Sequence, residues 1–335
     1  MVSLIIPTYK NSKTISYCLE SVLNQSFKDF ECLVVDYPAS NDNTAKVVQD
    51  YSDRDNRIHY LKSPHKGAMA QREFGIKKAK GDFLCFIDSD DIVDNDYIIT
   101  LYNNLISNDV DLSICEMLKC KKNDVASLRF QNKGYITKVF RNKKYKMLLK
   151  NYRFFIGNPT PVCIMGKKEI FFKACSYYNW HNNFISWEDS ILSYYLFFNS
   201  SSAVFSKERI LYYYINNDNK TYINKNDNIN NYLSDCVNVS RELLSIIKGS
   251  KYSHYYKQAS IYSIFGAIAY LLNNSSIDSF KYVIKTLSTK LRLRDIRVFE
   301  KEYTISEKLI AFSIKYRIFP LMALVITKVK RKKRN

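Results

Sequence analysis

The sequence predicts an α/β protein with a mostly parallel sheet, helices on both faces, and a helical C-terminal region. Through the first hundred residues, short continuous apolar runs alternate with amphipathic helical patterns. Continuous apolar runs mark strands that are covered on both faces, and their alternation with helices is typical of a parallel sheet. A polar, Asn-rich stretch at 221–232 then separates this part from further helical patterns. We therefore expect two domains, residues 1–215 and residues 216–335.

Each element of the first domain follows from a local pattern. The expected strands cover residues 2–9, 30–36, 57–63, 82–87 and 110–116. Between the first two strands, apolar residues recur at helical spacing from Ile15 to Leu23. A second helix is expected around 47–51, a third at 67–81 ending at Gly81, and a fourth at 97–107.

Composition and charge exclude several classes of protein. The chain of 335 residues is 46% hydrophobic, which excludes a disordered protein, and its net charge is +19. The first hundred residues carry more acidic than basic side chains, so the excess positive charge lies in residues 101–335. The cysteines form no C-x-x-C pair, which favours reduced, buried thiols in a cytosolic protein. Neither a signal peptide nor a membrane-spanning apolar run is expected.

The stretch "FLCFIDSDD" at 83–91 raises the question of function, because a buried strand leads into a cluster of carboxylates. Like charges repel, so a positive group is expected among them. In parallel sheets, ligands bind beyond the carboxyl ends of the strands. The other strand ends carry Pro7, Thr8, Tyr9 and Asp36. Neither G-x-G-x-x-G nor a P-loop is present, so a different nucleotide chemistry is needed.

Three segments in this order resemble the family 2 glycosyltransferases, which have the GT-A fold. They are "SLIIPTYKNSKTISYCLESVLNQSFKDFECLVVD", "GAMAQREFGIKKAKGDFLCFIDSDD" and "WEDSILSYYL", and the resemblance covers residues 1–215. It implies an enzyme that moves a sugar from a nucleoside diphosphate donor, by family habit a uridine one, to an acceptor hydroxyl with inversion at the anomeric carbon.

The resemblance also implies roles for residues at matching positions. Pro7, Thr8, Tyr9 and Asp36 match positions around the nucleobase, and Arg72 matches a basic position that faces the donor. Asp88, Ser89 and Asp90 match the D-x-D motif, which holds the ribose and Mn²⁺ or Mg²⁺, and Asp91 follows as a further candidate ligand. Oxygen ligands suit these hard ions. Asp189, with Glu188 beside it, matches the general base that takes the acceptor proton.

Simpler explanations exist for both acidic motifs. Aspartate is common in solvated turns after strands, and acids near a helix N-terminus are favoured by the helix dipole alone. The family segment after the second strand is usually acidic and glycine-rich, whereas this chain has Tyr37 and Pro38 there. That departure leaves open a non-catalytic protein that keeps the GT-A fold. A basic, aromatic stretch at 133–171 leaves open nucleic-acid binding, although no nucleic-acid-binding motif accompanies it.

The C-terminal sequence indicates binding to a membrane surface. After the capping box at 304–307, an apolar stretch joins a dense cationic tail, a pattern typical of a segment lying in the interface of an anionic membrane. The expected protein is cytoplasmic and peripheral on the inner face of the cell membrane. A polyprenyl-linked or glycan acceptor, in surface polysaccharide synthesis, fits this location, and nucleic acid is not expected as a partner.

Overall fold

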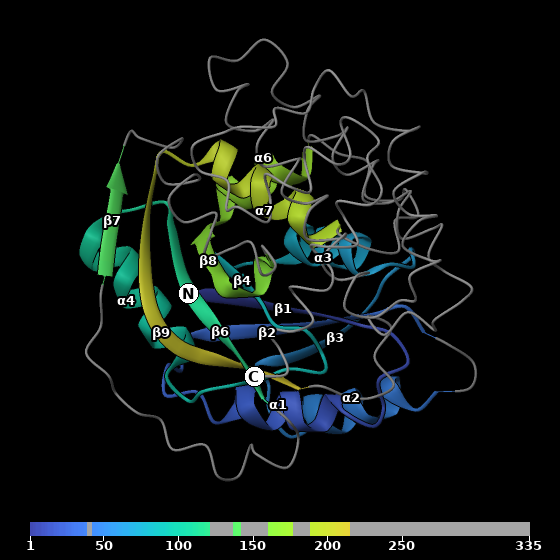
Figure 1. Cartoon of the computed structure of the whole chain (residues 1–335). Helices are drawn as coiled ribbons and strands as arrows, with labels where there is room; N and C mark the ends of the chain where they lie inside the picture. Colours follow the sequence, from blue (N-terminus) through green and yellow to red (C-terminus); the bar gives the residue numbers. More distant parts are fainter. Residues whose placement is uncertain (39–41, 121–136, 142–159, 177–187, 215–335) are drawn as a thin grey trace, which may run out of the picture. The chain divides into compact units, whose positions relative to one another are not determined.

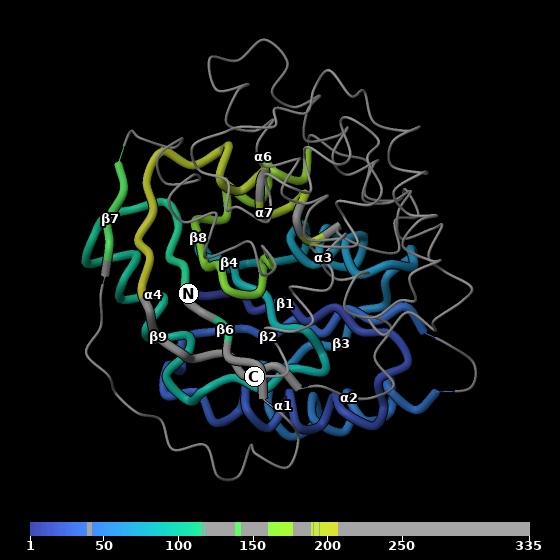
Figure 2. Tube along the Cα trace, in the orientation of Figure 1, coloured from blue at the N-terminus to red at the C-terminus, as the bar shows by residue number. Residues whose placement is uncertain are grey.

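The computed structural model describes residues 1–38, 42–120, 137–141, 160–176 and 188–214 (Figure 1). Figure 2 follows the same chain as a tube that is coloured along the sequence. The chain divides into two compact units, the first holding residues 1–148, 159–183 and 192–219. The second unit holds 149–158, 184–191 and 220–335, so α7 begins in it and continues in the first. The predicted helices and basic tail of residues 216–335 lie outside the described residues, and the predicted domain boundary stays a prediction.

The core of the first unit is a parallel sheet in the order β3-β2-β1-β4. Its strands are β3 (Ile58–Lys62), β2 (Phe30–Asp36), β1 (Val2–Thr8) and β4 (Phe83–Phe86). Every residue of β1 and β2 is buried, as their continuous apolar sequences predict. From β1 the chain continues to β2 and β3 on one side of β1, and it then returns to form β4 on the other side of β1. Such a reversal opens a crevice beyond the carboxyl ends of β1 and β4.

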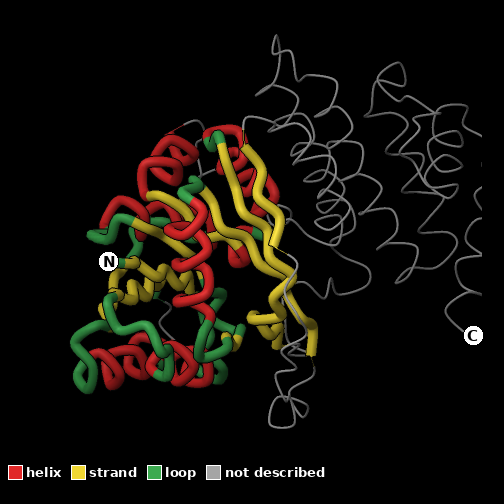
Figure 3. Tube along the Cα trace, turned by 90° about the vertical axis from the view of Figure 1, so that its left-hand side faces the viewer, coloured by secondary structure: helices red, strands yellow, loops and turns green. Residues whose placement is uncertain are grey.

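Beyond β4 the sheet becomes mixed. Figure 3 shows the strands of the sheet in yellow, lying side by side. The added strands are β5 (Ile92–Val93), β6 (Leu112–Cys120), β7 (Thr137–Arg141), β8 (Ile164–Lys167) and β9 (Ser202–Tyr214). β8 is antiparallel to both β4 and β6, whereas β6 and β9 are parallel. The predicted mostly parallel sheet is therefore confirmed in its first half, and antiparallel pairings extend it.

Helices cover both sides of the parallel strands (Figure 1). α1 (Ile15–Leu23) and α2 (Thr44–Ser52) lie on one side, and α3 (Ala68–Lys78) lies on the other. Gly75 lets α3 approach β1 closely, because a Cβ there would lie 2.5 Å from Cγ2 of Ile5. The remaining helices are α4 (Tyr97–Asn108), α6 (Lys168–Ser176), α7 (Glu188–Asn199) and the short 3₁₀ helix η2 (Pro161–Cys163).

Burial agrees with the helical stripes read from the sequence. Ile15, Leu19 and Val22 of α1 are completely buried, as is Leu192 of α7. Free and buried thiols are found at Cys18, Cys32, Cys85, Cys115, Cys163 and Cys175, which confirms the predicted buried thiols for these six residues. Of the helices in the described ranges, none combines the length and the apolar character needed to cross a membrane.

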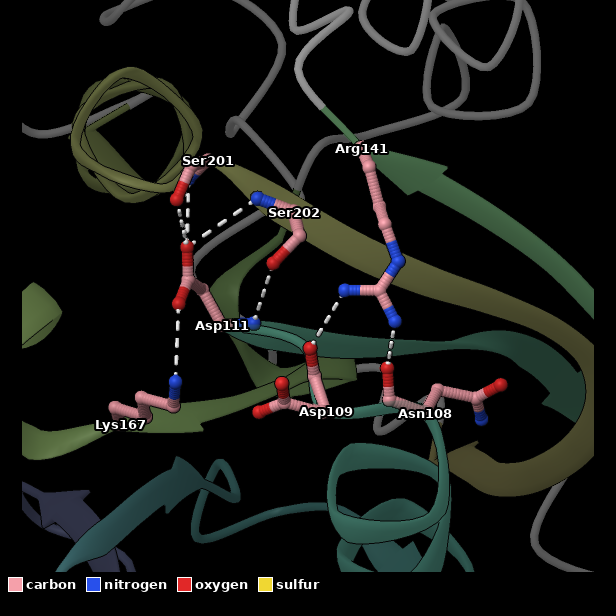
Figure 4. Close-up of polar contacts among 7 residues, drawn as sticks. All are labelled: Asn108, Asp109, Asp111, Arg141, Lys167, Ser201 and Ser202. Carbon is pink, nitrogen blue, oxygen red and sulfur yellow. Dashed lines mark hydrogen bonds and ion pairs between the residues drawn. The ribbon is translucent and has the colours of Figure 1, made fainter.

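A polar network fastens β6 to its neighbours at the end of the sheet opposite the carboxyl ends of the parallel strands (Figure 4). Asp111 Oδ2 accepts hydrogen bonds from the backbone N–H of Ser201 at 2.6 Å and from its hydroxyl at 2.7 Å. Lys167 Nζ lies 3.2 Å from the other carboxylate oxygen. Burial acts to raise the pKa of Asp111, but the hydrogen bonds from Ser201 and Lys167 outweigh it and lower the pKa.

We expect Asp111→Asn to lower the free energy of unfolding by about 2 kcal/mol near neutral pH, since several hydrogen bonds to a charged group weaken. A depressed pKa contributes stability above the unfolded value, and that contribution is lost as pH falls through the folded value. The difference from wild type should therefore shrink below about pH 4. Thermal unfolding across this range measures both effects. Asp109→Asn is the control, because Asp109 is exposed and at φ 42° asparagine is well tolerated. An equal loss at every pH would contradict the electrostatic explanation.

Candidate active site

The predicted acidic cluster forms a tight turn directly after β4. The backbone N–H of Asp91 donates to the carbonyl of Asp88 at 2.9 Å, which closes the turn. Burial differs sharply along it: the side chain of Asp88 is 27% exposed, Asp90 is half-buried, and Asp91 is completely buried. Two of the three carboxylates, those of Asp88 and Asp90, are therefore within reach of solvent or a ligand.

A buried arginine supplies the positive charge that the carboxylate cluster requires. Arg72 of α3 is 1% exposed, and its Nη2 forms an ion pair with Asp88 Oδ1 at 2.5 Å. Its guanidinium also lies 5.7 Å from the ring centroid of Phe86, and Nη1 lies 3.3 Å from Met69 Sδ. A buried guanidinium needs such partners, because leaving it uncompensated costs several kcal/mol. The contact fixes the carboxylate of Asp88 and joins α3 to the end of β4.

The first helix packs against the same turn. Asn11, just before α1, donates a hydrogen bond from Nδ2 to the hydroxyl of Ser89. The thiol of Cys18 in α1 donates to the carbonyl of Asp88 at 3.6 Å. Burial, together with the neighbouring aspartates, raises the pKa of Cys18 well above its usual range. This cysteine therefore stays protonated and serves the turn as a hydrogen-bond donor.

The predicted residue at the end of β2 has a partner that the sequence did not reveal. Asp36 is 2% exposed, and the hydroxyl of Tyr60 in β3 donates to its Oδ2 at 2.9 Å. Burial raises the pKa of Asp36, the hydrogen bond from Tyr60 acts to lower it, and the nearby charge of Asp42 raises it further. The carboxyl group is thus held in one orientation at the sheet edge where ligands bind.

Two aromatic rings and two lysines gather at the ends of β1 and β2. The rings of Tyr9 and Tyr37 lie 6.1 Å apart at 46°, and both residues are half-buried. Lys66 Nζ is 4.9 Å and Lys10 Nζ is 5.6 Å from the centroid of Tyr9. Tyr37 occupies the position where the family often has a second aspartate. Here it pairs with Tyr9, which gives this edge flat apolar faces beside positive charge.

Gln71 of α3 holds the two strand ends together. This side chain is 2% exposed, and its Nε2 donates to the carbonyls of Thr8, at 2.5 Å, and of Val35, at 3.0 Å. The carbonyls belong to neighbouring strands, β1 and β2, just before Tyr9 and Asp36. The amide therefore bridges the backbones that carry both of these side chains.

We expect Gln71→Met, which has a similar shape without the donor, to lower the free energy of unfolding by about 1–3 kcal/mol. The physical reason is that two buried carbonyls lose a hydrogen bond. The matched control is Gln49→Met, because Gln49 is exposed and its side chain donates a hydrogen bond at the surface to Asp53, the residue that follows α2. Denaturant unfolding of both variants makes the comparison. An equal effect of the two changes would show that the bridge contributes no particular stability.

The structure does not bring every predicted site residue to this edge. Pro7 and Thr8 are buried within β1, so a ligand contact by either stays a prediction. Asp189 is half-buried in the first turn of α7 and falls in the second unit, so its distance from the acidic turn is not defined. Glu188 begins the same helix. The general-base assignment of Asp189 and Glu188 is therefore still a prediction.

The donor set fits a hard divalent cation that is shared with a phosphate group. Within the described ranges, no three His, Cys, Asp or Glu side chains converge as a complete metal-binding group. However, Mg²⁺ keeps several waters and is held by one or two carboxylates together with substrate phosphates. Asp88 and Asp90 supply such carboxylates with partial exposure, whereas Asp91 is completely buried.

Comparisons with known proteins identify the family to which this chain belongs. The sequence model of glycosyl transferase family 2 matches residues 3–173, about half of the chain. The chain belongs to this family. One relative is the Escherichia coli UDP-Glc:alpha-D-GlcNAc-diphosphoundecaprenol beta-1,3-glucosyltransferase WfgD, 35% identical over 159 residues, which cover 45% of this chain and 56% of that protein. The chain also spans less than two thirds of the length of other curated relatives, GlyA and GlyG of Streptococcus pneumoniae.

Solved structures share the fold at low sequence identity. Residues 1–349 of Staphylococcus aureus TarS, in complex with UDP-GlcNAc, match with a TM-score of 0.69 and 16% identity over 99% of this chain and 92% of that one. The mannosyltransferase PcManGT of Pyrobaculum calidifontis, in complex with GDP-Man and Mn²⁺, matches with a TM-score of 0.51 and 15% identity over 95% and 87%. These matches confirm the predicted GT-A fold.

Proposed function

We propose that this chain is an inverting, metal-dependent glycosyltransferase that moves a sugar from a UDP-sugar to a hydroxyl of a glycan or lipid-linked acceptor. The observation that carries the proposal is the acidic turn after β4, with Asp88 held by Arg72 and Asp90 within reach of a ligand. Membership of the family supports glycosyl transfer. The UDP-GlcNAc of the TarS complex and the UDP-Glc in the name of WfgD support a uridine donor.

The nucleotide end of the donor is assigned to the ends of β1 and β2. Tyr9 and Tyr37 offer aromatic faces against which a base can stack, and the carboxylate of Asp36 accepts a hydrogen bond from a base N–H. Lys10 and Lys66 place positive charge beside these rings, which suits the anionic diphosphate that follows the nucleoside.

The diphosphate end is assigned to the acidic turn. Asp88 and Asp90 would hold Mn²⁺ or Mg²⁺ through carboxylate oxygens, with Arg72 keeping Asp88 in place. When bound, such an ion neutralises negative charge on the departing diphosphate. Ser89, held by Asn11, fixes the turn between the two aspartates.

The acceptor end is assigned to Asp189. Its carboxylate takes the proton of the acceptor hydroxyl while that oxygen forms a bond to the anomeric carbon from the face opposite the leaving group. The bond between the anomeric carbon and the diphosphate oxygen breaks, and its electron pair leaves with the nucleoside diphosphate. Glu188, the residue directly before Asp189, is assigned a supporting role in the same step.

A lipid-linked acceptor is supported by the name of one relative and by one feature of the chain. The name of WfgD specifies a diphosphoundecaprenol acceptor, and a polyprenyl chain keeps its cargo at the bilayer. The last residues of this chain are densely cationic, and each Lys or Arg near an anionic surface contributes about 1 kcal/mol. We propose peripheral docking at the inner face of the membrane, where surface polysaccharides are assembled.

A donor screen tests the proposal. The purified chain is incubated with UDP-Glc, UDP-GlcNAc, UDP-Gal and GDP-Man, each with Mn²⁺ or with EDTA, and release of the nucleoside diphosphate is measured. We expect metal-dependent release from at least one UDP-sugar. Thermal stabilisation by UDP without turnover of any sugar would instead support a non-catalytic protein with this fold. Binding of RNA with no response to any nucleotide would support the nucleic-acid alternative.

A further inference from the structure

The contact between Tyr60 and Asp36 joins two strands at the edge where the donor nucleotide is assigned. β2 and β3 are parallel, and Tyr60 pairs in register with Val34, two residues before Asp36. The side chains of Val34 and Asp36 share one face of the sheet because alternate residues of a strand do so. The phenol of Tyr60 therefore reaches along the sheet to Asp36 Oδ2 at 2.9 Å.

This hydrogen bond has two consequences for Asp36. It occupies one carboxylate oxygen and fixes the rotation of the group, which leaves Oδ1 to accept from a ligand. It also favours the ionised form, since a hydrogen bond donated to a carboxylate stabilises its charge. Burial and the charge of Asp42 both oppose ionisation, and Lys62, which pairs in register with Asp36, is exposed. Tyr60 therefore counters the two influences that would protonate Asp36.

An ionised carboxylate discriminates among nucleobases by hydrogen-bond direction. Uracil N3 and guanine N1 carry a hydrogen and donate to a carboxylate. The corresponding ring nitrogens of cytosine and adenine carry lone pairs and are repelled by it. A protonated carboxyl group reverses this preference, because it becomes a donor.

We propose that Tyr60 is a positioning residue for donor recognition, which orients Asp36 as the acceptor for the ring N–H of the nucleobase. The inference rests on the proposed function and extends it: Tyr60 does not touch the donor but sets which bases Asp36 accepts. The carboxylate of Asp36 selects bases with a ring N–H, and loss of the phenol hydroxyl weakens that selection.

Binding of three probes to the full chain tests the inference. UDP, CDP and inorganic pyrophosphate are titrated calorimetrically in the presence of Mn²⁺. For Tyr60→Phe we expect affinity for UDP to fall about tenfold, which is the effect of one hydrogen bond to a charged group. Affinity for pyrophosphate, which has no base, should change less than about twofold, and the preference for UDP over CDP should shrink.

Acidity provides a second readout. Removing the phenol hydroxyl raises the pKa of Asp36 further, so as pH falls, UDP binding by Tyr60→Phe should be lost at a higher pH than in wild type. The matched control is Tyr51→Phe. Tyr51 also donates to a carboxylate, Glu20 at 2.7 Å, but it lies in the last turn of α2. This control should leave the affinity for all three probes unchanged.

A double-mutant cycle separates the possible outcomes. In an Asp36→Asn background, Tyr60→Phe should cost little further affinity, because the residue it acts through is gone. Additive losses, equal losses for all three probes, or an unchanged UDP affinity would each overturn the inference while leaving the proposed function intact. A wild-type chain that binds none of the probes would overturn both.

Discussion

Asp90→Asn is expected to reduce sugar transfer by at least about a hundredfold and to abolish the effect of Mn²⁺ on UDP binding. The substitution keeps the size of the side chain but removes its charge, so the turn after β4 loses one of its two partly exposed carboxylates. Loss of a single group that stabilises developing charge typically costs about 10²–10³ in rate. Turnover and UDP titration, each with Mn²⁺ and with EDTA, measure the effect.

The control for this substitution is Asp96→Asn. Asp96 lies shortly after the acidic turn, is exposed, and accepts a hydrogen bond from Ser26 at 2.6 Å. Its replacement should change turnover less than about twofold, because Asp96 is exposed at the N-cap of α4, a position where asparagine is as favourable as aspartate. If Asp90→Asn kept metal-dependent turnover, the aspartates after β4 would belong to an ordinary polar turn that has no role in binding the metal.

Asp189→Asn should lower kcat by about 10²–10⁴-fold while affinity for UDP stays within about twofold. Proton transfer by a positioned side chain contributes a factor of this size, and asparagine cannot accept the proton. The separation between kcat and donor affinity distinguishes a base from a residue that holds the nucleotide. Transfer rates at saturating donor and calorimetric titration with UDP give the two quantities.

An exposed acid at the start of another helix provides the comparison for Asp189. Glu169 lies in the first turn of α6, where a negative charge is favoured by the helix dipole alone. Glu169→Gln should leave turnover near the wild-type value. If Asp189→Asn behaved in the same way, the acid at the start of α7 would serve helix stability and the acceptor proton would go elsewhere.

The parallel half of the fold could be predicted because its strands are buried on both faces. Continuous apolar runs at 2–8 and 30–36 have no other favourable environment, and the structure buries each residue of β1 and β2. The mixed half could not be predicted in this way. β5 has two residues, too few for a pattern, and β9 pairs in parallel with β6, which lies about ninety residues earlier.

The same distinction applies to the site. Some of its residues could be predicted from their place next to a strand, whereas others depend on contacts between residues that are far apart in the sequence. Asp36 ends one predicted strand, and Asp88 and Asp90 follow another, so their shared position at one sheet edge could be inferred from order alone. Tyr60 and Gln71 could not be identified in this way. Their hydrogen-bond partners lie 24 and 63 residues away, at Asp36 and Thr8, and only the packed structure brings each pair together.

Crystals grown with UDP and Mn²⁺ and measured at the manganese absorption edge test the central claim most directly. The account predicts an anomalous peak within bonding distance of Asp90 and of the UDP diphosphate, with Asp88 still paired to Arg72. A structure with UDP bound but no manganese at the end of β4, or with manganese held elsewhere, would contradict it.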